Sequence, residues 1–85
     1  MTEFTYRIRD PEGLHALPAG DLVKLAESFS CSITLDHNGN TVDSKRVMYV
    51  MSLGVKWNDS ITISCDGEDE VEAAAELKAL CERII

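Results

Sequence analysis

Hydrophobic and polar residues alternate in three segments of the chain, with the two-residue period of a half-buried strand. These segments are residues 4–9, 31–36 and 60–65. A fourth and shorter segment, Thr41-Val42, follows the second one across the dipeptide Asn38-Gly39. Asn-Gly between two such segments is a strong signal of a β-hairpin, because both residues tolerate positive φ. The pattern therefore predicts four strands, two of them joined as a hairpin.

Two segments between these strands have hydrophobic residues at helical spacing. The first covers residues 18–28, and Pro18 suits its first turn, where the missing N–H needs no partner. The second covers residues 46–53, with Ser44 as its predicted N-cap and Gly54 as its stop. We expect a helix in each segment, the second of them short.

A third helix is predicted at the C-terminal end of the chain. It begins near Asp69, with Glu72 three residues later as the second half of a capping pair. The element order is then β-α-β-β-α-β-α within one domain, residues 1–85. This mixed order with a hairpin predicts an α+β sandwich whose helices cover one face of the sheet. The hydrophobic residues expected on the inner side of the third helix are Val71, Ala74, Ala75, Leu77, Leu80, Cys81 and Ile84.

Composition narrows the possible functions. Eight Lys and Arg against fifteen Asp and Glu give a net charge of −7, which argues against a nucleic-acid partner because phosphate contacts require a basic surface. No hydrophobic run approaches the roughly 20 residues that span a bilayer, and the first residues lack the pattern of a signal peptide. We therefore expect a cytoplasmic protein without direct membrane insertion. The three cysteines form no Cys-x-x-Cys pair and are expected to be buried, reduced thiols.

His15 is the residue most open to a chemical role. It stands between a turn, residues 10–13, and the start of the first helix. The first N–H groups of a helix have no internal acceptor and lie at the positive end of the helix dipole, where phosphate and other anions bind. Either His15 takes part in such a site, or it is a loop histidine without a chemical role. The second histidine, His37, lies in the predicted hairpin and is expected to be a solvent-exposed turn residue.

Two stretches of the chain match known motifs at the right spacing. Residues 13–19 read Gly-Leu-His-Ala-Leu-Pro-Ala, and residues 45–54 read Lys-Arg-Val-Met-Tyr-Val-Met-Ser-Leu-Gly. The first stretch resembles the signature Gly-(Leu/Ile)-His-Ala-Arg-Pro-Ala of HPr, the histidine-containing phosphocarrier of the bacterial sugar phosphotransferase system. The second is similar to the family's block Lys-Ser-Ile-Met-x-Val-Met-Ser-Leu-Gly. The element order, the hairpin and the length also agree, so the resemblance covers essentially the whole chain.

The resemblance implies both a fold and a function. The fold is the open-faced β-sandwich of HPr, with a four-stranded antiparallel sheet and three helices on one face. His15 would accept a phosphoryl group, on Nδ1 in the family, from phosphorylated enzyme I and pass it to a histidine of enzyme IIA. The backbone N–H groups of Ala16 and Leu17 would stabilise the phosphoryl charge. Such a protein is a stoichiometric carrier rather than an enzyme, acts as a monomer, and needs neither a metal nor another cofactor.

The second motif would form the docking surface for these partners. Val47, Met48 and Met51 match the family's hydrophobic patch, and methionine adapts to several partners. The alternative is that these side chains belong to the core of the protein. The residues expected to contact partners also include Leu17, Lys24, Lys45 and Arg46.

Three positions depart from the family pattern. Leu17 replaces an arginine that neutralises phosphate oxygens, and a lost charge-assisted hydrogen bond is worth roughly 1.5–3 kcal/mol. Glu12 replaces a small polar residue, and a carboxylate near His15 repels an arriving phosphate. Arg46 replaces the serine of regulatory phosphorylation in Gram-positive members.

Two hypotheses about function follow from these departures. The first is a working phosphocarrier. The second is an HPr-like paralogue, a regulatory module that binds a protein partner and has weak or lost phosphoryl transfer. An enzymatic function finds no support, because the sequence has no acid/base pair, no phosphate loop and no metal-ligand spacing.

Overall fold

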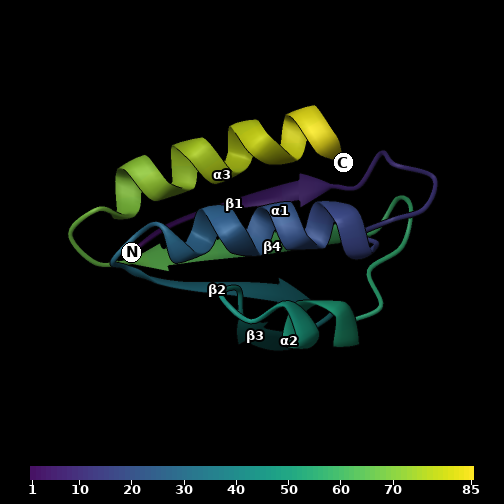
Figure 1. Ribbon diagram of the computed structural model, residues 1–85, viewed down its shortest axis with the longest axis horizontal. Coiled ribbons are helices and arrows are strands. Elements are labelled where there is room, and N and C mark those ends of the chain that lie inside the picture. The colour runs from purple at the N-terminus through teal and green to yellow at the C-terminus, as the bar shows by residue number, and fades with distance from the viewer.

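The computed structural model describes residues 1–85 and has the predicted order of elements (Figure 1). The strands form one sheet in the order β1-β4-β2-β3, and every neighbouring pair is antiparallel. All three helices lie on the same face of this sheet, so the expected α+β open-faced sandwich is confirmed. None of these helices has the length and hydrophobicity needed to cross a membrane. The elements are β1 (Thr2–Arg7), α1 (Ala16–Glu27), β2 (Ser32–His37), β3 (Asn40–Asp43), α2 (Val47–Ser52), β4 (Ser60–Asp66) and α3 (Glu70–Ile84).

The two faces of the sheet differ in polarity because side chains alternate along each strand. The face away from the helices is polar: Thr5 and Thr62 share a hydrogen bond of 3.1 Å, and Ser64 Oγ donates to Glu3 at 2.9 Å. The alternation read from the sequence thus separates core from solvent. The helix-covered face carries the buried residues Ile33, Leu35, Ile61, Ile63 and Cys65.

All three cysteines are free and buried, as expected. Burial raises the pKa of the Cys31 thiol to about 11 and that of Cys81 to about 12. Thiols with such pKa values stay protonated at neutral pH and are poor nucleophiles. The cysteines therefore act as small hydrophobic residues within a core of 21 buried side chains.

The hairpin between β2 and β3 forms at the predicted dipeptide. Asn38 and Gly39 have φ values of 53° and 84°, the two positive values that a type I′ turn requires. The expectation of an exposed His37 was wrong, because this residue ends β2 with its ring buried. His37 is buried because it continues the alternation by which every second side chain of β2 faces the core. Its Nε2 has a hydrogen-bond partner there, because Asp59 Oδ2 lies 3.0 Å away.

Of the two predicted helix caps, the Ser44 cap was wrong, and Asp69 takes the predicted N-cap position of α3 without forming the capping bond. Ser44 is fully buried without a hydrogen-bond partner for its Oγ, and Arg46 is the N-cap residue of α2. Asp69 precedes α3 but makes no capping bond. Its carboxylate accepts hydrogen bonds instead from the backbone N–H groups of Ser30 and Cys31, at 2.8 and 2.9 Å. Asp69 thus binds backbone N–H groups that are distant in the sequence instead of those at the start of its own helix.

The first and third helices differ in detail from the prediction. The α1 helix begins at Ala16, two residues earlier than expected, so its first turn includes the family motif. On α3 the inner side includes Ala73, whereas Val71 and Ala75 are exposed. The remaining predicted residues of that side are buried or partly buried: Ala74, Leu77, Leu80, Cys81 and Ile84.

Three segments that are distant in the sequence meet at one end of the sandwich, where β1 leads into α1 (Figure 1). The Leu14 N–H donates to the Val55 carbonyl in the loop between α2 and β4, at 3.0 Å. The Asp10 N–H donates to the carbonyl oxygen of Ile85, just after α3, at 2.9 Å. The loop before α1 is therefore held from two sides.

Gly13 allows the loop before α1 to lie close against the loop between α2 and β4. Its φ is +70°, and a Cβ at this position would lie 2.5 Å from the Val55 oxygen and 2.7 Å from the Lys56 Cα. Real Cβ atoms do not approach backbone atoms so closely. Only glycine therefore fits between the two loops.

We expect Gly13→Ala to lower the free energy of unfolding by about 2–5 kcal/mol, because it combines an unfavourable φ with overpacking against backbone. Gly20→Ala is the matched control. Gly20 lies in α1 with no atom within 4 Å of an added Cβ, so alanine should stabilise the helix by about 0.5–1 kcal/mol. Urea unfolding of both variants measures the difference. Changes of the same sign and size in the two variants would contradict this account of the loop contact.

Candidate functional site

His15 lies where the sequence placed it, as the N-cap residue immediately before α1. Its backbone is extended, with φ −84° and ψ −177°, and its carbonyl accepts the first hydrogen bond of the helix from Ala19 at 3.0 Å. The imidazole is partly exposed. The ring therefore stands at the entrance to the helix N-terminus and is open to solvent on one side.

The first turn of α1 leaves two backbone donors free. The N–H groups of Ala16 and Leu17 have no acceptor in the protein, and Pro18 has no N–H. No acidic residue occupies this turn. Two N–H groups at the positive end of a helix of 12 residues form a suitable environment for an anion beside His15.

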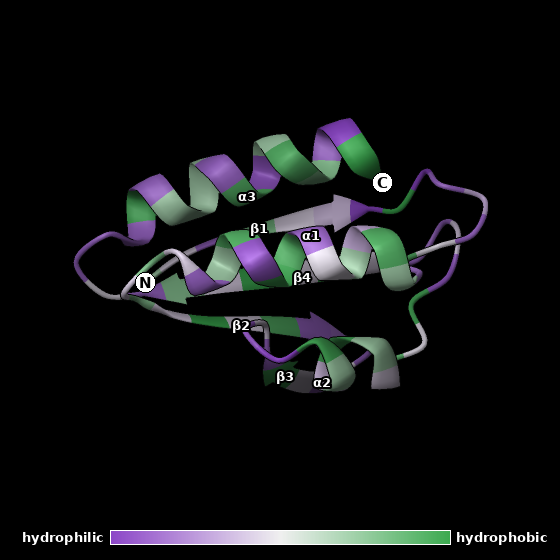
Figure 2. Ribbon diagram, in the orientation of Figure 1, coloured by the Kyte–Doolittle hydropathy of each residue, from purple (hydrophilic) through white to green (hydrophobic).

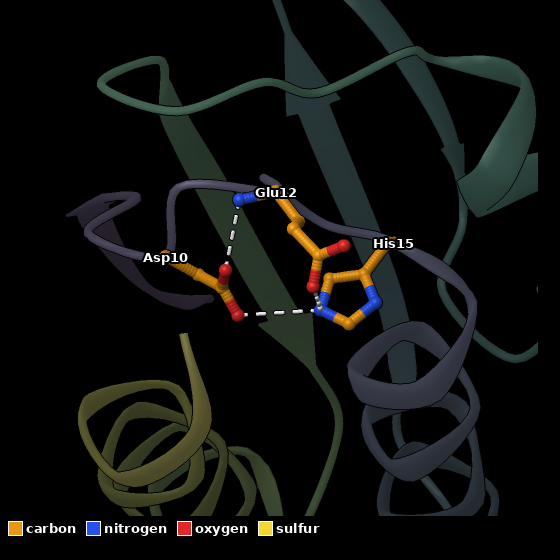
Figure 3. A group of neighbouring side chains, drawn as sticks. All are labelled: Asp10, Glu12 and His15. Atoms are coloured by element: carbon orange, nitrogen blue, oxygen red, sulfur yellow. Dashed lines mark hydrogen bonds and ion pairs between the residues drawn. The ribbon is translucent and has the colours of Figure 1, made fainter.

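Two carboxylates lie on one side of the His15 ring (Figure 3). Asp10 Oδ2 is 3.2 Å from Nε2, and Glu12 Oε2 is 3.8 Å from the same nitrogen. The backbone N–H of Glu12 donates to Asp10 Oδ1, and this bond, together with the His15 ring, holds the pKa of Asp10 below its ordinary value. The other ring nitrogen, Nδ1, points away from both carboxylates (Figure 3).

From the sequence, Asp10 is predicted only as part of a turn. The signal was present, because two acidic residues stand five and three positions before the histidine. These three side chains place ligand atoms within 4.8 Å of one another, a spacing that could hold a divalent cation although the sequence showed no metal-ligand pattern. Among the three side chains themselves, the shortest contact is the one between Asp10 Oδ2 and His15 Nε2, at 3.2 Å.

A pocket of about 320 Å³ opens beside the imidazole. Three of its lining residues are acidic, and no lysine or arginine lines it. The helix N-terminus is therefore the main positive element at this site. The lining residues are Asp10, Glu12, His15, Leu17, Pro18, Asp21 and Ile84.

The hydrophobic residues of the second motif are on the surface rather than in the core. Met48 and Leu17 are each 74% exposed, and Val47 and Met51 are exposed as well. Only Val50 of α2 is buried. The residues of α2 are mostly hydrophobic, as the colours of its ribbon in Figure 2 show, and this helix packs against α1. The core alternative for Met48 and Met51 was therefore wrong.

The predicted partner-binding cations lie in two places. The Arg46 guanidinium stacks on the Tyr49 ring at 4.7 Å, and Lys45 Nζ donates to the Phe29 carbonyl at 2.8 Å. Lys24 lies apart from them, because it lines a groove between α1 and α3. None of the three forms an ion pair with a carboxylate.

Comparison with known proteins gives the family. The family model described as "PTS HPr component phosphorylation site" matches residues 2–83. A crystal structure of HPr-C-His from Thermoanaerobacter tengcongensis has 39% sequence identity and a TM-score of 0.92, with 96% of this chain and 92% of that chain covered. The histidine-containing phosphocarrier protein of Mycoplasma has 38% identity and a TM-score of 0.91, with 93% and 90% covered. The chain belongs to the HPr family of phosphocarrier proteins.

The similar structures also include a variant of the family. Crh, the catabolite repression HPr of Bacillus subtilis, has 33% identity and a TM-score of 0.77, with 100% of this chain and 98% of that chain covered. That structure is described as a dimer with domain swapping, and a further T. tengcongensis HPr structure is described as a dimer. The monomer expected from the sequence therefore stays a prediction.

Proposed function

We propose that this protein carries phosphoryl groups on His15, accepting them from phosphorylated enzyme I and delivering them to an enzyme IIA of a sugar phosphotransferase system. The observation that supports this most is the position of His15 beside the two free N–H groups of Ala16 and Leu17. In the transfer, the lone pair of a ring nitrogen forms the new N–P bond while the N–P bond on the donor breaks. The electron pair of the broken bond returns to the donor's imidazole.

The chemistry of the imidazole and the two N–H groups both support an N–P bond that can form and break again. An imidazole is neutral and nucleophilic near neutral pH, yet a phosphoryl group on its nitrogen is labile. The two N–H groups would hold phosphoryl oxygens by charge-assisted hydrogen bonds without any side-chain movement. We propose that no metal or other cofactor takes part in this transfer.

The proposed docking surface consists of Leu17, Val47, Met48 and Met51, all of them exposed hydrophobic residues. Exposed hydrophobic side chains of this size on adjoining helices are typical of an interaction surface. Met48 and Met51 adapt their shape, which suits a protein that must bind a donor and an acceptor in turn. Arg46, at the start of α2, would add a positive charge at the rim.

A second candidate function is that of an HPr-like regulatory module with weak or lost transfer. Leu17 in place of arginine and three carboxylates in the pocket at His15 favour it, since both features make the site less attractive to phosphate. The similarity to Crh shows that regulatory relatives share this fold. Loading of His15 by enzyme I separates the two candidates.

Enzyme I and phosphoenolpyruvate should add one phosphoryl group to the protein, and His15→Ala should abolish the addition. The adduct should be acid-labile and stable in base, as expected of an N–P bond. Intact-mass analysis measures it, with His37→Gln as the control: this variant removes the other histidine of the chain, and the glutamine amide can still donate to Asp59. An acid-stable adduct, or one that persists in His15→Ala, would contradict the proposal.

Leu17→Arg should raise the rate of phosphorylation about tenfold or more, equivalent to at least about 1.4 kcal/mol of transition-state stabilisation. A guanidinium at this position would supply the positive charge that the pocket lacks. Stability should change by less than about 0.5 kcal/mol, because the side chain is exposed. Leu17→Gln is the control for loss of the hydrophobic side chain. An unchanged or lower rate in Leu17→Arg would mean that the partners have adapted to leucine.

Arg46→Ser should slow transfer from enzyme I and weaken its dependence on salt. Charges at the rim of an interface act mainly on the association rate, and salt screens that attraction. Transfer rates at two salt concentrations measure both effects. Equal rates and equal salt slopes in the two proteins would exclude a role for Arg46 in docking.

A further inference from the structure

Asp10 is held in place by hydrogen bonds of both its backbone and its side chain. Its backbone N–H donates to the Ile85 carbonyl at 2.9 Å, and its own carbonyl accepts from Gly13 at 2.9 Å. Within the side chain, Oδ1 accepts from the Glu12 N–H at 2.9 Å. Only Oδ2 is left, and it faces His15 Nε2 at 3.2 Å.

This arrangement determines which ring nitrogen carries the proton. An ionised carboxylate has acceptors only, so the atom that it contacts must be a donor. A neutral imidazole has one N–H, and a hydrogen bond at one nitrogen fixes the state of the other. With Nε2 protonated and bound to Asp10, the lone pair of the neutral ring lies on Nδ1.

We infer that Asp10 is a positioning residue for phosphoryl transfer, which keeps His15 in the tautomer whose Nδ1 is free to attack phosphorus. The inference rests on the proposed function and adds a residue to it. The carboxylate does not contact the phosphoryl group; it acts through the imidazole.

The same proton can stay in place through the whole cycle. When Nδ1 forms the N–P bond, the ring becomes a cation that keeps its Nε2–H, and the Asp10 carboxylate balances that charge. When the phosphoryl group leaves for the next acceptor, the N–P electron pair returns to Nδ1 and the ring becomes neutral again. No proton therefore has to be gained or lost at His15 in either direction.

Glu12 does not share this role, although its carboxylate is near. Its Oε2 lies 3.8 Å from Nε2, beyond hydrogen-bonding distance, and its side chain is 76% exposed whereas that of Asp10 is 23% exposed. The two acids therefore provide a matched pair of positions for an experiment.

The test is the nitrogen NMR spectrum of His15 in the unphosphorylated protein at about pH 8, above the range in which an ordinary imidazole binds a second proton. Protonated and unprotonated ring nitrogens have well-separated chemical shifts. The wild type and Glu12→Gln should both show a protonated Nε2. Asp10→Asn should invert the tautomer: the amide oxygen is needed by the Glu12 N–H, so the amide N–H₂ faces Nε2 and makes it an acceptor.

A protonated Nδ1 in the wild type, or a protonated Nε2 that persists in Asp10→Asn, would overturn the inference. If Asp10→Asn does not fold, Asp10→Ser gives the same test, because serine can accept from the Glu12 N–H but is too short to hold the ring. There the preference for Nε2–H should weaken; an unchanged preference would overturn the inference.

Transfer gives a second readout. The rate should fall about tenfold or more in Asp10→Asn, because the reactive tautomer becomes the minor one. Glu12→Gln should show no such loss. The NMR result does not depend on phosphorylation, so a wild type that shows the predicted tautomer but no adduct would reject the proposed function and leave Asp10 as the residue that sets the tautomer.

Discussion

The contact between the loop before α1 and the loop before β4 is the constraint on which the site depends. Gly13 lies so close to the backbone of Val55 that no side chain fits between them. The second loop is itself fixed, because Asp59 accepts hydrogen bonds from the Lys56 N–H and from the buried His37. A histidine outside the candidate site therefore helps to hold the loop that positions His15.

The surroundings of His15 combine one element that would attract a phosphate group and one that would repel it. The helix N-terminus offers two N–H groups, whereas Asp10, Glu12 and Asp21 place negative charge around the pocket. Asp10 lies on the Nε2 side of the ring, so its charge can balance a cationic imidazole. Glu12 and Asp21 make no hydrogen bond to the ring, and their charges would oppose an arriving phosphate. Attraction of a phosphoryl group would therefore come from the backbone N–H groups and from cations that a partner brings.

The sequence predicted the elements whose signals are local. Strand alternation and the Asn38-Gly39 turn depend only on neighbouring residues. The structure has this turn and all four strands, with strand ends shifted by at most two residues from the prediction. The wrong predictions concern residues whose burial or hydrogen bonds depend on a partner distant in the sequence. His37 is buried because Asp59, 22 residues away, satisfies its nitrogen, and Asp69 binds the backbone at Ser30 and Cys31 instead of capping α3. The contact between Asp10 and His15 likewise requires the loop geometry that Gly13 and Ile85 impose.

The central claim is that His15 carries a phosphoryl group between two partners, and delivery tests it most directly. The protein is loaded with labelled phosphate by enzyme I and phosphoenolpyruvate, separated from enzyme I, and mixed with an enzyme IIA. We predict that the label leaves His15 and appears on the histidine of enzyme IIA much faster than it is lost to water. Label that stays on the protein, or that is released only as inorganic phosphate, would contradict a carrier function.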